Sequence, residues 1–166
     1  MKKVLLVIFV VLLFGCSKEK MDYLDETKST KISSFDIENT YLNSSSNDII
    51  KSLGDPDYIE EVESSPEKYY IYGPKEDKSD LEIGVSNEKI SCFLLFTNEY
   101  EFNNDTIINQ SKDEIVSRYG SNYYLREDTG SNILGYFDKE NNYNLEFYLN
   151  AEDNVTHLIL EIYEDQ

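Results

Sequence analysis

Two short stretches of the chain, 45–54 and 111–120, place apolar residues on one face of a helix. The apolar positions follow the spacing i, i+1 and i+4, and they are Ile49, Ile50, Leu53, Ile115, Val116 and Tyr119. Each stretch begins with a serine, whose hydroxyl accepts a free backbone N–H, and ends with a glycine, which tolerates a left-handed helix end. Ser111 and Glu114 also form the capping-box pattern. We therefore predict a short helix in each stretch.

After each predicted helix, apolar and polar residues alternate in short runs separated by turn-forming residues. This period of two is typical of antiparallel strands with one covered face. The expected strands are 58–63, 69–72, 81–85, 90–97, 123–127, 133–137, 143–149 and 155–163. Two of them, 90–97 and 155–163, are apolar on both faces, so we expect them at the centre of a sheet or where two units meet.

The two halves of the chain show the same order of predicted elements. A weak internal repeat aligns the first serine-to-glycine stretch with the second. We therefore expect an α+β fold of two tandem units, 32–104 and 105–166, each a short helix followed by three or four antiparallel strands.

The amino-terminal residues predict export and a lipid anchor. A positive start is followed by an apolar run over 4–14, too short to span a bilayer, which needs roughly 20 residues. Leu13, Gly15 and Cys16 resemble a bacterial lipobox, in which the cysteine receives a diacylglyceryl group and acyl chains such as palmitate. We expect a signal peptide over 1–15 and a lipidated flexible tether over 16–31, with a short helix over 21–26 as the alternative for part of the tether. Lipid on Cys16 would then be the membrane attachment.

Composition narrows the classes of partner. The chain has 33 acidic and 15 basic residues, which gives a formal charge of −18. Nucleic-acid binding depends on clustered lysine and arginine, so we expect no nucleic-acid partner. A hydrophobic content of 40% is enough to form a core, which argues against a wholly disordered chain. The excess of acid instead favours a protein partner with a basic surface.

One motif resembles a known family. The segment Ile49-Ile50-Lys51-Ser52-Leu53-Gly54-Asp55-Pro56-Asp57, followed by Tyr69-Tyr70-Ile71-Tyr72, resembles the SmpA/OmlA (BamE-like) lipoprotein domain. A doubled helix–sheet unit is also similar to the beta-lactamase inhibitor protein fold. The second copy lacks the proline after Gly120. The resemblance implies an envelope protein that works by binding other proteins.

The residues that carry most catalytic chemistry are sparse. His157 is the single histidine, and Cys92 lies in an apolar run where a buried thiol is expected. We assign no catalytic residue, no cofactor and no metal ligand, and we expect no enzyme activity. The clustered acidic residues Asp55, Asp57, Glu60 and Glu61 leave calcium binding open, because carboxylate oxygens are calcium ligands.

Tyrosines supply the candidate binding residues. Tyrosine is common at interfaces because it combines apolar area with a polar tip. Among the 14 tyrosines we select Tyr70, Tyr72 and Tyr148 as partner-binding candidates, and Tyr148 lies opposite the apolar face of its strand.

The sequence favours a lipid-anchored envelope protein that binds another envelope or secreted protein. It would serve in envelope assembly. Ser17, where some enteric bacteria place an inner-membrane retention aspartate, favours the outer membrane or the cell surface. Two alternatives remain: an inhibitor or immunity protein against a hydrolase or toxin, and a carboxylate-based enzyme.

Overall fold

The part of the chain that the structure describes forms two α-helices and eight strands, with a short 3₁₀ helix ahead of them. The computed structural model describes residues 18–74 and 79–163. Helix η1 (Lys20–Tyr23) comes first, and α1 (Ser46–Leu53) and α2 (Lys112–Tyr119) each precede four strands. The strands are β1 (Tyr58–Glu61), β2 (Glu67–Tyr72), β3 (Leu81–Ser86), β4 (Lys89–Leu95), β5 (Tyr124–Asp128), β6 (Ser131–Asp138), β7 (Tyr143–Leu149) and β8 (Val155–Ile162).

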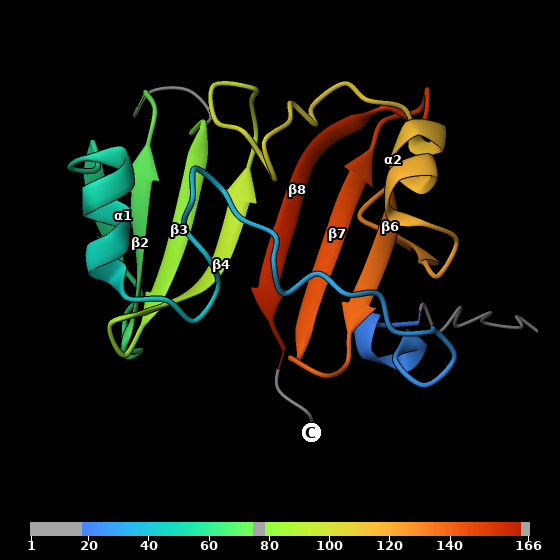
Figure 1. Ribbon diagram of the computed structural model, residues 1–166, viewed down its shortest axis with the longest axis horizontal. Coiled ribbons are helices and arrows are strands. Elements are labelled where there is room, and N and C mark those ends of the chain that lie inside the picture. Colours follow the sequence, from blue (N-terminus) through green and yellow to red (C-terminus); the bar gives the residue numbers. More distant parts are fainter. Residues whose placement is uncertain (1–17, 75–78, 164–166) are drawn as a thin grey trace, which may run out of the picture.

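All eight strands belong to one antiparallel sheet. The order across the sheet is β1-β2-β3-β4-β8-β7-β6-β5, so β4 and β8 are hydrogen-bonded neighbours at its centre. The expected α+β fold of two tandem helix–strand units is therefore wrong. The molecule is mostly β, and its eight strands make a single continuous sheet (Figure 1). The apolar strands at the middle explain the difference, since neither has a polar face that could border solvent at an edge.

Each helix begins and ends as its capping residues dictate. The Ser45 hydroxyl accepts the Asn47 N–H, and Ser111 and Glu114 form a reciprocal capping box. Gly54 and Gly120 end the helices with φ of 81° and 91°, a region that favours glycine. Both glycine carbonyls then accept a tyrosine hydroxyl from the sheet, Tyr72 and Tyr136, each at 2.9 Å. These bonds tie each helix end to the strands beneath it.

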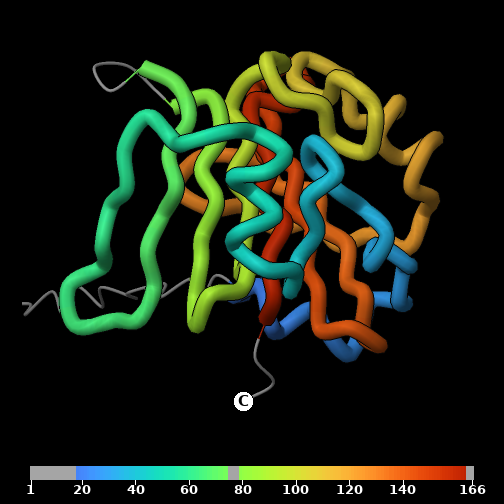
Figure 2. The backbone as a smooth tube through the Cα atoms, turned by 60° about the vertical axis from the view of Figure 1, so that its left-hand side comes forward, coloured from blue at the N-terminus to red at the C-terminus, as the bar shows by residue number. Residues whose placement is uncertain are grey.

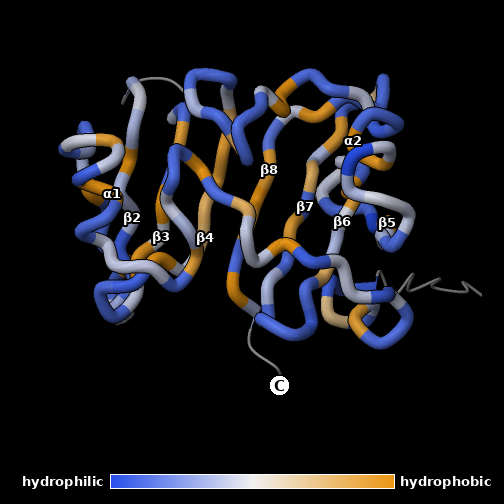
Figure 3. The backbone as a smooth tube through the Cα atoms, viewed as in Figure 1, coloured by the Kyte–Doolittle hydropathy of each residue, from blue (hydrophilic) through white to orange (hydrophobic). Residues whose placement is uncertain are grey.

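Helices α1 and α2 cover one face of the sheet, and among the described helices only the short η1 lies on the other face. Residues 24–45, which we call the strap, run from η1 to α1 and cross the same face between α1 and α2 (Figure 1). Hydrophobic positions concentrate along the strands, and the loops are mostly hydrophilic (Figure 3). The fully buried core on the helix-covered face includes Ile37, Ile49, Ile83, Phe93, Phe102, Ile115, Tyr136, Phe147 and Leu160.

The strap passes around one end of the sheet and is held there by a buried carboxylate. Asp138, at the end of β6, is 1% exposed. Its carboxylate accepts the backbone N–H groups of Ile32 and Ser33 at 3.0 and 3.1 Å, and it also accepts donors from Glu140 and Asn141 in its own hairpin. Thr30 N–H donates to the Phe137 carbonyl beside it. The strap is therefore fixed to the β6–β7 hairpin.

The chain from Lys18 onward lies against the sheet, where a flexible tether had been expected over 16–31. Tyr23 of η1 stacks on Tyr124, and Lys20 forms an ion pair with Glu161. The predicted lipid attachment at Cys16 and the signal peptide over 1–15 lie outside the described residues and stay predictions. Within 18–74 and 79–163, no helix has the length and apolar character needed to cross a membrane.

Candidate binding surface

The face of the sheet opposite the helices, which we call the open face, is defined by strand register. Its residues alternate with the core positions and align in rows across the strands. One row contains Tyr58, Ile71, Glu82, Leu94, Ile159, Glu146, Gly135 and Tyr124. Because no helix longer than η1 lies on it, this face is where the described structure offers a binding surface.

A buried ion pair occupies the β5–β7 part of the open face. The Arg126 guanidinium binds the Glu146 carboxylate through two bonds, with Nε–Oε1 at 2.7 Å and Nη2–Oε2 at 2.9 Å. The side chains of Arg126 and Glu146 are only 8% and 3% exposed. Asp128 accepts a further bond from Arg126 at 3.1 Å. This pairing raises the pKa of Arg126. Both charges are satisfied inside the protein, so they are suited to fixing strand geometry.

Gly135 leaves room for Tyr124 to join this ion pair. A Cβ at Gly135 would meet the Tyr124 ring at 2.1 Å, so the ring lies directly on the glycine backbone. In that position the Tyr124 hydroxyl donates to Glu146 at 2.6 Å and accepts from Asn144 at 2.9 Å. Burial, followed by the charge of Glu146, raises the pKa of the Tyr124 hydroxyl. Helix η1 covers the outer side of Tyr124 through Tyr23.

Three aromatic rings form a row beside the ion pair. His157 stacks between Tyr148, at a centroid distance of 4.2 Å, and Phe96, at 5.6 Å. The row crosses from β7 over β8 to the residue after β4, and all three side chains are partly exposed. The row therefore offers ring edges to solvent over the middle of the open face.

Acidic and aromatic residues share the β1–β4 part of the open face. Glu60, Glu67 and Glu82 lie among Tyr58 and Tyr69 on these strands. Burial raises the pKa of Tyr69, and the charges of Glu67 and Glu82 add to that shift. The basic Lys89, at the β3–β4 turn, donates to Asn43 instead. This part of the surface is therefore negative and partly apolar.

Cys92 lies under the acidic part of the face and is buried. Its burial raises the pKa of the thiol to about 11. A thiol with that pKa is protonated at neutral pH, and the thiolate is the nucleophilic form. The Cys92 side chain therefore behaves as a packed apolar group. It lies over Gly84, where a Cβ would approach its sulfur to 2.4 Å.

The three tyrosines predicted to bind a partner lie on different faces of the sheet. Tyr70 and Tyr72 are on the helix-covered face and are 8% and 3% exposed, so they contribute to the core. Tyr148 lies on the open face and is partly exposed. Sequence reasoning missed other residues of the open face, Tyr69 above all. Along each strand these residues alternate with the core residues, and that alternation is the signal that could have identified them.

The acidic residues considered for calcium do not form a metal site. Among residues 18–74 and 79–163, no group of three or more histidine, cysteine, aspartate or glutamate side chains is arranged to hold a metal ion. One of these acids has a structural role, because the Asp57 carboxylate accepts the Gly73 N–H at 2.8 Å.

Comparison with known proteins gives similarity at the level of the fold. The chain matches no protein-family model. It also matches no curated protein. Among solved structures it is similar to an extracellular protein containing an SCP domain from Bacillus anthracis, with a TM-score of 0.53 and 11% sequence identity over 81% of this chain and 48% of that chain.

Two further structures show weaker similarity. They are a cysteine-rich secretory protein from Staphylococcus aureus, with a TM-score of 0.49 and 12% identity over 81% of this chain and 46% of that chain, and a DUF4309 family protein from Bacillus subtilis, with a TM-score of 0.44 and 15% identity over 76% of this chain and 84% of that chain. This chain spans about half the length of the first two proteins. At such identities the likeness concerns the fold alone.

The expected resemblance to SmpA/OmlA (BamE-like) domains and to beta-lactamase inhibitor protein is therefore wrong. The solved structure with the higher TM-score is that of a protein containing an SCP domain, and the single eight-stranded sheet differs from the tandem units that the resemblance implied. The Leu53-Gly54-Asp55-Pro56 motif that suggested the family marks a helix end followed by a bend.

Proposed function

We propose that this protein is a lipid-anchored module of the bacterial cell envelope that binds another protein through the open face of its sheet. The partner presents a basic surface, and the lipid on Cys16 holds the complex at the membrane. The extracellular origin of the Bacillus anthracis protein with a similar fold supports an exported location.

The observation that carries the proposal is the combination of charge and aromatic area on β1–β4. Glu60, Glu67 and Glu82 supply negative charge beside Tyr69, and neither α1 nor α2 lies over them. Aromatic side chains with a polar tip are common anchors of protein interfaces, and complementary charge accelerates encounter. Tyr148 and its stacked neighbours extend the same surface toward β7.

Site-specific photo-crosslinking in cells tests the surface directly. A photoreactive residue replaces Ser86, which is partly exposed on the open face, or Lys51, whose side chain is 73% exposed on the helix side. We expect a discrete crosslinked protein at position 86 and not at position 51. The absence of an adduct at both positions would contradict the proposed partner. Equal adducts at both positions would contradict the assignment of the open face.

Binding kinetics test the role of charge once that partner is identified. We expect the association rate to fall as salt rises, because the Debye length is only about 8 Å at physiological ionic strength. The dissociation rate is expected to rise about tenfold in Tyr69→Ala and Tyr148→Ala, since buried aromatic anchors mainly slow dissociation. An association rate that does not depend on salt would contradict electrostatic steering.

A further inference from the structure

Strand β5 forms a free edge of the sheet within the described residues. It pairs with β6 on one side, and the strand order ends there. Its exposed residues are Leu125, at 44%, and Glu127. An edge strand has backbone N–H and C=O groups that can pair with another chain.

The β5–β6 turn determines which backbone groups point outward. Thr129 and Gly130 form a two-residue turn with φ of 46° and 84°, as in a type I′ hairpin. The residues flanking such a turn, Asp128 and Ser131, exchange hydrogen bonds, and alternate residues follow the same pattern. The backbone N–H and C=O groups of Leu125 and Glu127 therefore point away from β6. No hydrogen bond to them appears from elsewhere in the described chain.

The other residues of β5, which alternate with Leu125 and Glu127, hold this edge in place through their side chains. Arg126 is bound by Glu146 through two bonds and by Asp128 through a third. Tyr124, also on β5, donates to the same glutamate. Because these four side chains join β5 to β7 across β6, the edge is rigid before any ligand arrives. Rigidity of this kind lowers the entropic cost of binding.

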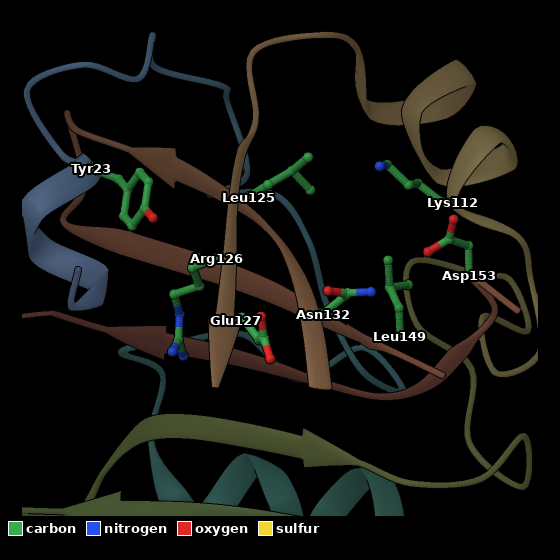
Figure 4. Close-up of a pocket in the computed structure, with 8 residues that line it drawn as sticks. All are labelled: Tyr23, Lys112, Leu125, Arg126, Glu127, Asn132, Leu149 and Asp153. Atoms are coloured by element: carbon green, nitrogen blue, oxygen red, sulfur yellow. The ribbon is translucent and has the colours of Figure 1, made fainter. Parts of the chain in front are cut away.

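A surface depression adjoins the outward residues. It has a volume of about 420 Å³, and on the side toward which Leu125 points it is lined by Lys112, Glu127, Asn132, Leu149 and Asp153. Tyr23 and Arg126, on the other side of β5 in Figure 4, also line the depression, so it extends along both sides of this edge strand and reaches the buried ion pair. In strand addition, backbone hydrogen bonds supply affinity and such a depression receives every second side chain.

We propose that the β5 edge binds an extended peptide segment of another protein as a ninth strand. The segment hydrogen-bonds to the backbone of Leu125 and Glu127 and places one apolar side chain against Leu125 and Leu149. Its flanking residues are basic, because Glu127 and Asp153 outnumber Lys112 around the site, Arg126 is already paired with Glu146 and Asp128, and the chain carries a formal charge of −18. That same charge opposes pairing with a second copy of this chain.

Proline substitution removes an outward backbone N–H, and Glu127→Pro does so while it keeps the apolar contact that Leu125 supplies. Leu125→Pro removes an outward N–H without removing a bond to β6, and proline is tolerated at such edge positions. Ile59→Pro is the matched control at the opposite edge, on β1, which projects in a hairpin with β2 (Figure 2). Ile59 is 48% exposed, and its N–H points outward because Val62 N–H donates to the Glu67 carbonyl three residues further on. Thermal unfolding of both variants shows whether the fold is kept.

A library of random twelve-residue peptides displayed on phage is the probe, with the full chain in mild detergent as the target. We expect enriched peptides to combine alternating apolar residues with lysine or arginine. Their synthetic forms should bind Leu125→Pro about tenfold more weakly than Ile59→Pro and slow hydrogen exchange at Glu127 N–H. Glu127→Pro should give the same loss of affinity as Leu125→Pro.

Three results would overturn the inference. They are the absence of enriched peptides, equal affinity of the peptides for both proline variants, and a dimer of the purified chain that Leu125→Pro dissociates. The last result would identify a second copy as the occupant of the edge. None of these variants alters the open face, so this site and the proposed function can fail independently.

Discussion

At the scale of single residues, two glycines are required for different reasons. Gly135 has an ordinary strand conformation but no room for a Cβ, which would meet the Tyr124 ring at 2.1 Å. Gly54 has free space around it but a φ of 81°. One position is therefore constrained by packing and the other by backbone conformation.

We expect Gly135→Ala to reduce the free energy of unfolding by about 3 kcal/mol, because the methyl group must displace Tyr124 from its bond to Glu146. Gly54→Ala should cost about 1 kcal/mol through backbone conformation alone. Urea unfolding of both variants measures the difference. The double variant Gly135→Ala/Tyr124→Ala should lose less free energy of unfolding than the two single variants lose together. Losses that simply add would exclude the clash with Tyr124 as the cause.

The Cys92 thiol predicts a dependence of stability on alkaline pH. Its pKa is raised to about 11 in the folded protein, against roughly 8.5 for an unperturbed thiol. The folded state thus holds the proton more tightly. The resulting stabilisation is complete below the unfolded pKa and is lost as pH rises from there through the folded pKa.

We expect the urea concentration at the unfolding midpoint to decrease in the natural chain as the pH is raised from about 8.5 to about 11. The decrease should be smaller in Cys92→Ala. Alkylation by iodoacetamide, followed on the peptide that contains Cys92, should be slow at pH 8 and become fast in urea. Rapid alkylation of the folded protein would contradict a buried, protonated thiol.

At the scale of elements, the strap depends on Asp138. Asp138→Ala leaves the N–H groups of Ile32 and Ser33 without their acceptor, and we expect a loss of about 3 kcal/mol in the free energy of unfolding. Hydrogen exchange at these two amides should accelerate more than exchange in β8. Ser29→Ala is the control, since it removes an exposed bond to Lys139 N–H at the same place and should change stability by less than about 1 kcal/mol.

At the scale of the whole molecule, the β4–β8 pair joins the two halves. Phe93 faces Leu160 in this pair, and Phe102 packs against Phe147 at a centroid distance of 6.4 Å within the same core. A continuous sheet over a continuous core predicts cooperative unfolding of the entire domain.

We therefore expect Leu160→Ala to reduce the free energy of unfolding by about 3 kcal/mol, with hydrogen exchange in β2 and β6 accelerated together. Exchange measured on peptides from both halves in moderate urea provides the test. Leu125→Ala, at the exposed edge, should leave exchange in both strands unchanged. If β2 kept its protection while β6 lost it, the halves would be separate folding units.

Local sequence alone was sufficient to predict the elements. Ser45 and Gly54 delimit the first helix as expected, Ser111 and Glu114 form the predicted capping box, and eight strands occur near the predicted segments. The predicted central place of 90–97 and 155–163 is also confirmed by the strand order. These features depend on residues within a few positions of one another, so their signals are present in the sequence itself.

Only the tertiary structure decided how the elements combine. It made a single sheet of the two halves, assigned Tyr70 and Tyr72 to the core and Tyr148 to the open face, and fixed Arg126 against Glu146. It also placed the chain after Lys18 against β5 and β8. Such contacts join residues far apart in the chain. Alternation shows that a strand has two faces, but which face the helices cover depends on the packing of the whole core.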